Sequence, residues 1–185
     1  MGRLIVFEGI DCSGKSTQSK LLGEYLNCPV LHFPYQVSKS IEEIRHSNSD
    51  LTNHLLMAAN RLETQSKIKE YLSKGDLILD RYTYSGIAYG MARGLSSKWC
   101  IDLESQLIQP DIVIYMDMDY ILASKRKGYG EGENEKIEFQ SQVYWAYNGL
   151  LEKNINNAKL IRINANDDKD KITQLIKNKI PINIQ

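Results

Sequence analysis

The sequence has few cysteines, no net charge and no long apolar run, and each scarcity excludes a class of protein. Its three cysteines are Cys12, Cys28 and Cys100, an odd number without a C-x-x-C pair, which fits neither a disulfide framework nor a zinc site. Lys plus Arg and Asp plus Glu both number 23, so no excess of positive charge attracts nucleic acid or an anionic membrane. Apolar runs such as Ile112–Met116 are far shorter than the roughly 18 residues of a membrane-spanning helix.

These absences predict a protein that is neither secreted nor embedded in a membrane. We expect a reducing compartment, the cytoplasm or else the nucleus, and neither nucleic acid nor a membrane as partner. The 185 residues, 42% apolar and 25% charged, suit one hydrophobic core. Because no repeat or long linker divides the chain, we expect a single domain over residues 1–185.

Short apolar runs alternate with amphipathic stretches along the chain. Five runs predict strands buried on both faces, over residues 4–7, 30–33, 77–79, 111–116 and 160–163. Between and after these strands, apolar residues recur at helical spacing. They predict helices over residues 15–26 and 143–151, one long helix with a single buried stripe over 55–72, and a last helix after 166–168. This order predicts an α/β fold with a five-stranded parallel sheet flanked by helices on both faces.

The strongest chemical signal is the segment Gly9–Thr17, which satisfies G-x-x-x-x-G-K-[ST] between a predicted strand and a predicted helix. Glycines let backbone N–H groups turn toward phosphate oxygens, and the helix N-terminus adds its positive dipole end. Lys15 neutralises the β- and γ-phosphates, and the Ser16 hydroxyl can bind Mg²⁺. The segment therefore predicts a P-loop that binds a nucleoside triphosphate.

The rest of the sequence narrows the class of P-loop protein. A GTPase reads guanine through N-K-x-D, whereas the Asn178-Lys179 pair of this chain is followed by Ile-Pro. A motor or a helicase requires further domains, for which 185 residues leave no room. A kinase of a small molecule is the class that this sequence favours.

Further motifs are F-E-G-x-D with the P-loop, F-P at 33–34, A-N-R at 59–61, D-R-Y-x-x-S-G-x-A-Y at 80–89 and Q-P-D at 109–111. Together they resemble the thymidylate kinase family. The resemblance runs in order from residue 4 to about residue 165. It implies the P-loop nucleotide-kinase fold with a mobile lid at about 125–138, transfer of the γ-phosphoryl group of ATP to dTMP, Mg²⁺ as cofactor and a homodimer packed through helices.

The resemblance also implies roles for single residues. The catalytic residues would be Asp11, Lys15, Asp80 and Arg81, with Ser16 binding Mg²⁺ and Asp80 organising it through water. Contacts with ATP would come from Gly9, Ser13, Gly14, Lys15, Ser16, Thr17, Arg126 and Ala165. Contacts with dTMP would come from Asp11, Phe33, Gln36, Met57, Asn60, Arg61, Arg81, Ser85, Gly86, Tyr89 and Gln140. For Tyr89, simple packing of its helix is the alternative.

The chain departs from the family pattern at several positions. Gln36 stands where the family carries an arginine on the acceptor phosphate, and loss of such a charge-assisted pair costs about 1.5–3 kcal/mol unless another cation replaces it. Met57 replaces a phenylalanine that stacks on thymine in many members. Cys12 and Glu133 stand where members place a P-loop or a lid arginine. We therefore expect a working but slow kinase.

Two alternatives to a thymidylate kinase stay open at this level. One is a nucleoside monophosphate kinase with a different or broader choice of acceptor. The other is a catalytically weak nucleotide-binding protein that acts through its interactions. Turnover distinguishes the second alternative from a kinase, and the preferred acceptor distinguishes the first.

Overall fold

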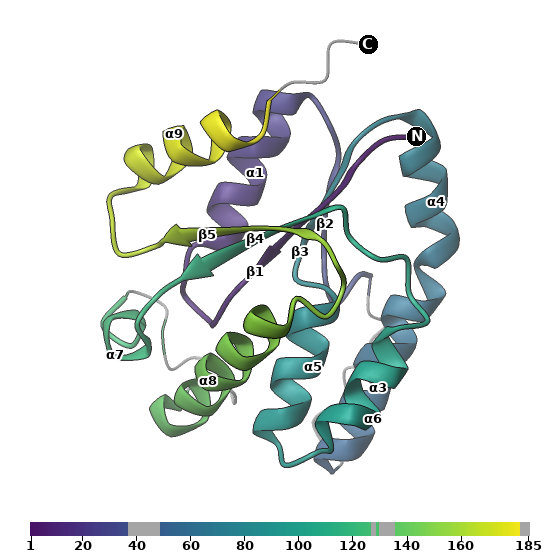
Figure 1. The fold of residues 1–185 in the computed structure, drawn as a ribbon, viewed down its shortest axis with the longest axis vertical. Coiled ribbons are helices and arrows are strands. Elements are labelled where there is room, and N and C mark those ends of the chain that lie inside the picture. The colour runs from purple at the N-terminus through teal and green to yellow at the C-terminus, as the bar shows by residue number, and fades with distance from the viewer. Residues whose placement is uncertain (37–48, 127–128, 130–135, 182–185) are drawn as a thin grey trace.

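A five-stranded parallel sheet forms the middle layer of the computed structural model, which describes residues 1–36, 49–126, 129 and 136–181 (Figure 1). Its strands lie in the order β2-β3-β1-β4-β5. They are β1 (Leu4–Glu8), β2 (Val30–His32), β3 (Leu77–Asp80), β4 (Ile112–Asp117) and β5 (Lys159–Asn164). The predicted fold class is confirmed, and each predicted strand begins and ends within one residue of the observed one.

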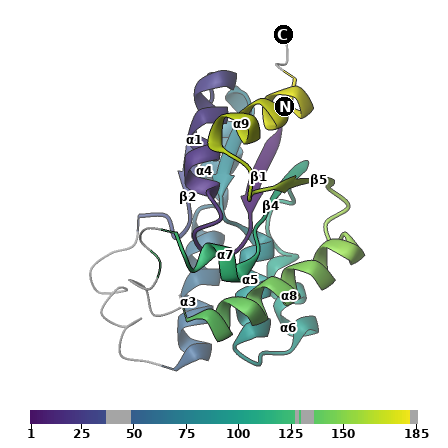
Figure 2. The ribbon, with the colours of Figure 1, turned by 90° about the vertical axis from the view of Figure 1, so that its left-hand side faces the viewer.

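Helices cover both faces of the sheet (Figures 1 and 2). Helices α1 (Lys15–Leu26) and α9 (Lys169–Lys179) lie together on one face, and α5 (Thr83–Ala92) and α8 (Ile137–Lys153) on the other. The remaining helices are α3 (Asp50–Glu63), α4 (Gln65–Lys74), α6 (Ser97–Glu104) and the short α7 (Tyr120–Ala123). In the described part of the chain, no helix is long and apolar enough to cross a membrane.

Alternate residues of β1 face opposite layers of the core. Leu4 and Val6 belong to the buried cluster that contains Ile68 of α4, whereas Ile5 belongs to the cluster that contains Leu22 of α1. The same alternation continues to Glu8, the last residue of the strand. Because Glu8 is fully buried, the strand delivers a carboxylate into the interior on the side of α5.

The prediction of one long helix over 55–72 is wrong, because two helices meet at Thr64. The Thr64 hydroxyl donates to the Asn60 carbonyl at 2.7 Å, a back-bond that is typical of bent helices. The predicted apolar stripe also fails in α3, where Leu55 and Leu62 are exposed while Asn60 and Arg61 are buried. These two polar side chains turn inward because they find partners there, as described below.

The other helices agree with the sequence pattern. Helix α1 spans the predicted 15–26, and α8 includes the predicted 143–151. Helix α9 begins after Asp168, whose side chain accepts hydrogen bonds from the backbone N–H groups of Asp170 and Lys171. The predicted lid at 125–138 lies largely outside the described residues, which include Lys125, Arg126, Tyr129 and 136–138 in this region.

Candidate active site

The P-loop joins β1 to α1 at the carboxyl edge of the sheet, where open α/β sheets bind ligands. Gly9 and Gly14 have φ angles of 144° and 93°, in the region that favours glycine. A Cβ on Gly9 would lie 2.8 Å from the Met116 carbonyl oxygen. Helix α1 begins directly after Gly14 with no acidic residue in its own first turn, and the free N–H groups at its N-terminus favour an anion.

Lys15 lies folded into this loop. Its side chain is buried, and its Nζ donates to the Ile10 carbonyl at 2.5 Å and to the Ser13 hydroxyl at 3.2 Å. Burial, together with the nearby Arg81 charge, lowers the pKa of Lys15 to about 8, although neighbouring carboxylates act in the opposite direction. Incoming phosphate oxygens would replace these neutral acceptors by charged ones.

Asp80 ends β3 and faces the first turn of α1. Its Oδ2 accepts from the Ser16 hydroxyl at 2.5 Å and lies 3.0 Å from Nδ1 of His32. Burial on its own raises the pKa of Asp80, but the His32 contact, the Lys15 charge and the Ser16 hydrogen bond together lower it. His32 was not predicted as a site residue, although it lies one residue before the end of the predicted strand 30–33 and so near this edge of the sheet.

The Asp80 and Ser16 side chains fit a magnesium ion. The Asp80 Oδ1 atom is buried, and the described residues offer it no hydrogen-bond partner. No group of three or more His, Cys, Asp or Glu side chains that could hold a metal occurs in the described ranges. This sparse protein donor set suits Mg²⁺, which usually keeps several waters and binds substrate phosphates through one or two carboxylates.

Arg81 follows Asp80 and turns back over the P-loop. It has a left-handed φ of 69°, and its backbone N–H donates to the Phe7 carbonyl at 2.9 Å. Its guanidinium pairs with Asp11 and donates to the Gly9 carbonyl at 3.3 Å. The structure thus brings three predicted site residues, Gly9, Asp11 and Arg81, into contact across 70 positions or more of sequence.

Gln140 and Tyr89, both predicted from the family resemblance to contact dTMP, lie beside this cluster. Gln140 donates to the Asp11 carboxylate at 2.7 Å and accepts from the Asp11 backbone N–H at 3.0 Å. The Tyr89 ring centroid lies 5.2 Å from the Arg81 guanidinium carbon and stacks edge-on against Phe139. Tyr89 therefore contacts the Arg81 guanidinium and also packs against Phe139.

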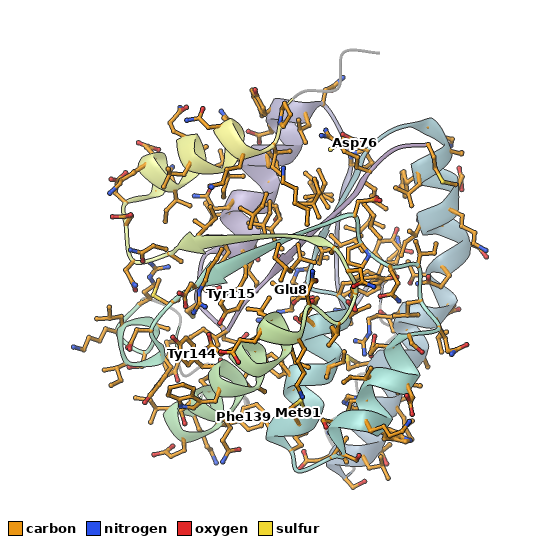
Figure 3. All side chains as sticks on the ribbon, viewed as in Figure 1. Glu8, Asp76, Met91, Tyr115, Phe139 and Tyr144 are labelled. Carbon is orange, nitrogen blue, oxygen red and sulfur yellow. The ribbon has the colours of Figure 1, made fainter. Side chains whose placement is uncertain are left out.

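Glu8, at the end of β1, lies on the side of the sheet that α5 and α8 cover (Figure 3), and the sequence did not predict a role for it. Its Oε1 accepts from the backbone N–H groups of Tyr82 at 3.0 Å and Ser85 at 3.2 Å. Its Oε2 accepts from the hydroxyls of Ser85 at 2.5 Å and Tyr147 at 3.0 Å. Burial raises the pKa of Glu8, and the hydrogen bonds from Ser85 and the Arg81 charge offset part of that rise. The Glu8 carboxylate thereby caps the N-terminus of α5. The N-cap residue of this helix, Tyr82, makes no capping hydrogen bond with its own side chain.

On the donor side, Arg126 links the P-loop to the turn after β5. It donates to the Cys12 carbonyl at 3.0 Å and to the Ala165 carbonyl at 2.7 Å. Ala165 is buried, and its backbone N–H donates to the Asp117 carbonyl at 2.8 Å. Arg126 and Ala165, both predicted to contact ATP, therefore lie together beside the loop. Ser16 and Thr17, at the start of α1, are exposed on the same edge.

On the acceptor side, Asn60 and Arg61 are engaged with protein groups. Asn60 accepts from the Tyr35 N–H and donates to the Tyr35 carbonyl, both at 2.7 Å. It thereby holds the turn after the cis Phe33-Pro34 bond. At the far end of this turn, Gln36 is exposed with a φ of 46°.

Arg61 forms a buried ion pair with Glu104. Its Nε donates to Glu104 Oε2 at 3.0 Å, and its Nη2 pairs with Oε1. Both residues are at least 94% buried, with exposures of 6% and 2%. A Cβ on Gly86 would overlap the Glu104 carboxylate and lie 2.6 Å from Arg61 Nη2. Glycine at position 86 therefore makes room for the pair.

Comparison with known proteins identifies the family. The family model for thymidylate kinase matches residues 7–176. The thymidylate kinase of Plasmodium falciparum is 40% identical, over 94% of this chain and 91% of its own length, and that of Schizosaccharomyces pombe is 42% identical over 77% and 73%. This chain belongs to the thymidylate kinase family. A solved thymidylate kinase structure from Candida albicans superposes with a TM-score of 0.81 at 29% identity, covering 97% of this chain and 91% of that one.

Among the residues predicted from the resemblance to thymidylate kinases, two groups can be distinguished by their contacts. Asp11, Lys15, Asp80 and Arg81 converge around the P-loop. By contrast, Asn60, Arg61 and Ser85 direct their polar atoms to protein partners. Phe33 is buried with its ring centroid 5.6 Å from that of Tyr82, and Met57 is half-buried on α3. The polar groups of Asn60, Arg61 and Ser85 are therefore already satisfied within the protein.

We predict that ATP binding is accompanied by proton uptake at alkaline pH. The lowered pKa of Lys15, about 8, leaves the amine mostly neutral at pH 8.5, and the phosphates of ATP raise its pKa again. Isothermal titration in buffers of different ionisation enthalpy should find uptake of a large part of one proton at pH 8.5. Little uptake is expected at pH 6.5, where Lys15 is already charged.

The Lys15→Met variant is the control for this experiment. It has no amine to protonate, so the difference between buffers at pH 8.5 should disappear. Equal uptake by the variant and the wild type would assign the proton to another group and contradict the prediction.

Proposed function

We propose that the chain transfers the γ-phosphoryl group of ATP to the phosphate of dTMP, which yields ADP and dTDP. Membership of the family makes the chain a kinase of dTMP. The observation that carries the proposed chemistry is the contact of Arg81 with both Gly9 and Asp11. It places a guanidinium between the P-loop and the start of α5, where donor and acceptor phosphates would meet.

The charges around the P-loop suit phosphoryl transfer. A phosphate oxygen of dTMP attacks the γ-phosphorus, and the bond from that phosphorus to the β,γ-bridging oxygen breaks. The P-loop N–H groups and Lys15 hold the donor phosphates, and Arg81 bridges to the acceptor. Ser16 and Asp80 would hold Mg²⁺, which supplies further neutralisation of the phosphate charge.

Two arginines contact carbonyl groups of the P-loop itself. Arg81 reaches Gly9 at 3.3 Å and Arg126 reaches Cys12 at 3.0 Å. We propose that these two side chains provide the positive charge that other members obtain from an arginine in the loop. Asp11, held by Arg81 and Gln140, would receive the acceptor's 3′-hydroxyl.

Recognition of the base would depend on Arg61, whose guanidinium is already oriented in this structure. The Glu104 pair fixes the plane of the Arg61 guanidinium, so that its orientation toward a base is set before dTMP arrives. Met57 would cover the ring face with its thioether. Gln36 is neutral, and we therefore propose a weaker hold on the acceptor phosphate than in members with arginine there.

The test of this function is ADP release from Mg²⁺·ATP with dTMP, dUMP, UMP, CMP, AMP or GMP as acceptor. We predict a strong preference for dTMP. In other P-loop enzymes, an arginine that stabilises the transition state raises the rate by about 10³–10⁵-fold. Arg81→Ala should therefore lower kcat by about 10³-fold at saturating substrates. Near-full activity of Arg81→Ala would contradict its assigned role.

Lys15→Ala serves as the control for contaminating kinases and should abolish the dTMP-dependent rate. Turnover with another acceptor in preference to dTMP would contradict the proposed substrate. Absence of turnover with every acceptor would contradict the kinase assignment altogether.

We also propose that the chain forms a homodimer through α3 and α6. Leu51, Leu55 and Leu62 of α3 are exposed by 46%, 44% and 43%, and Trp99 of α6 by 38%. The rings of His54 and Trp99 lie 5.5 Å apart and join the two helices. An apolar patch on neighbouring helices is typical of a protein–protein interface.

We further propose that the protein works in the cytoplasm or the nucleus, because its cysteine usage favours a reducing compartment.

Light scattering coupled to size-exclusion chromatography tests the dimer. We expect twice the chain mass of 21.2 kDa for the wild type and a monomer for Leu55→Asp, because a charge buried in an apolar interface is strongly unfavourable. Leu175→Asp on α9, where the leucine is 37% exposed, is the matched control and should remain dimeric. A monomeric wild type, or a dimeric Leu55→Asp variant, would contradict this interface.

A further inference from the structure

His32 occupies a place in the fold that packing does not require. It is the last residue of β2, the strand at one end of the sheet, and its side chain is 58% exposed. In the strand register it stands directly opposite Asp80 of β3. Partners in register point to the same face of a sheet, so the imidazole and the carboxylate emerge side by side.

The contact between them restrains one oxygen of Asp80. Oδ2 is held by the Ser16 hydroxyl at 2.5 Å and by Nδ1 of His32 at 3.0 Å. The other oxygen, Oδ1, is buried and has no hydrogen-bond partner among the described residues. Two contacts on Oδ2 fix the rotation of the carboxylate group, and this rotation determines where Oδ1 points.

The two supports of Oδ2 are not equivalent once a metal arrives. The Ser16 hydroxyl is itself the P-loop group that binds Mg²⁺ in this motif. If its oxygen were to bind the ion, the contact of His32 with Oδ2 would still be in place. The imidazole would act on the ion only through Asp80.

We propose that His32 is a positioning residue that holds Asp80 in the rotation needed to receive the waters of Mg²⁺. The inference rests on the proposed function, since it deepens the role of the magnesium site. It requires the tautomer or protonated form in which Nδ1 carries a hydrogen and donates to Oδ2. Groups that orient a metal-binding side chain in this way typically contribute 10- to 100-fold in metal affinity or activity.

Two substitutions separate hydrogen bonding from side-chain volume. In His32→Asn the Nδ2 atom is bonded to Cγ, as Nδ1 is in histidine, so the variant keeps a donor near the same position. His32→Leu keeps a similar branched shape at Cγ but has no donor. Since the His32 side chain is mainly exposed, neither change opens a cavity in the core, and thermal unfolding should show that both variants are fully folded at the assay temperature.

The direct readout is metal binding without turnover. Electron paramagnetic resonance of free Mn²⁺, titrated into enzyme with a non-hydrolysable ATP analogue, gives the metal affinity of each variant. We expect a loss of about 10-fold for His32→Leu and of less than about threefold for His32→Asn. The Mg²⁺ concentration for half-maximal kinase activity should rise in parallel, while KM for dTMP at saturating Mg²⁺ stays unchanged.

Two results would overturn the proposal. One is wild-type Mn²⁺ affinity in His32→Leu, and the other is an equal loss in both variants. The Mn²⁺ titration needs no acceptor, so it decides the role of His32 even in an enzyme that failed to phosphorylate dTMP. Failure of the proposed function and failure of this inference are thereby distinguishable.

Discussion

The buried carboxylate of Glu8 is the constraint on which the rest of the site depends. It lies at the end of β1, directly before the P-loop, and is fully excluded from solvent. Burial of an ion without partners is prohibitively unfavourable, and here four hydrogen bonds from α5 and α8 offset that cost. The favourable end of the α5 dipole adds to them. One side chain therefore joins the nucleotide-binding strand to two helices of the opposite layer (Figure 3).

The position of Arg81 follows from this constraint. The residue lies between Asp80, which ends β3, and Tyr82, whose N–H is held by Glu8. With both neighbours fixed, its backbone takes a left-handed turn, and its guanidinium reaches Gly9 and Asp11. Such preorganised charge needs no rearrangement at the moment of transfer, which is the main electrostatic contribution of many enzymes. The Ser85 hydroxyl is part of the same support, because it donates to Glu8 and lies 2.8 Å from the Tyr147 hydroxyl oxygen.

The sheet and the donor half of the site could be predicted from sequence because their signals are local. A strand buried on both faces is a short apolar run, and the P-loop is a contiguous motif between a strand and a helix. The acceptor half depends on pairs far apart in the chain, such as Arg61 with Glu104 at a separation of 43 residues. Such pairs turn polar residues of α3 inward and leave its leucines outside, which periodicity alone cannot foresee. His32 was missed for the same reason, since its partner Asp80 becomes its neighbour only in the register of β2 with β3.

The central claim is that Glu8 acts on catalysis through the position of Arg81, and a double-mutant cycle tests it most directly. Glu8→Gln keeps an oxygen that accepts from the two backbone N–H groups at the start of α5. Its amide nitrogen donates to the Ser85 and Tyr147 hydroxyls instead of accepting from them, so the variant removes the charge and reverses two hydrogen bonds with little change of shape. We predict that Glu8→Gln lowers kcat by about 10-fold in the wild type and by less than about twofold in an Arg81→Ala background, because coupled residues are strongly non-additive. The same fold-loss in both backgrounds would show that the two residues act independently and would contradict the account.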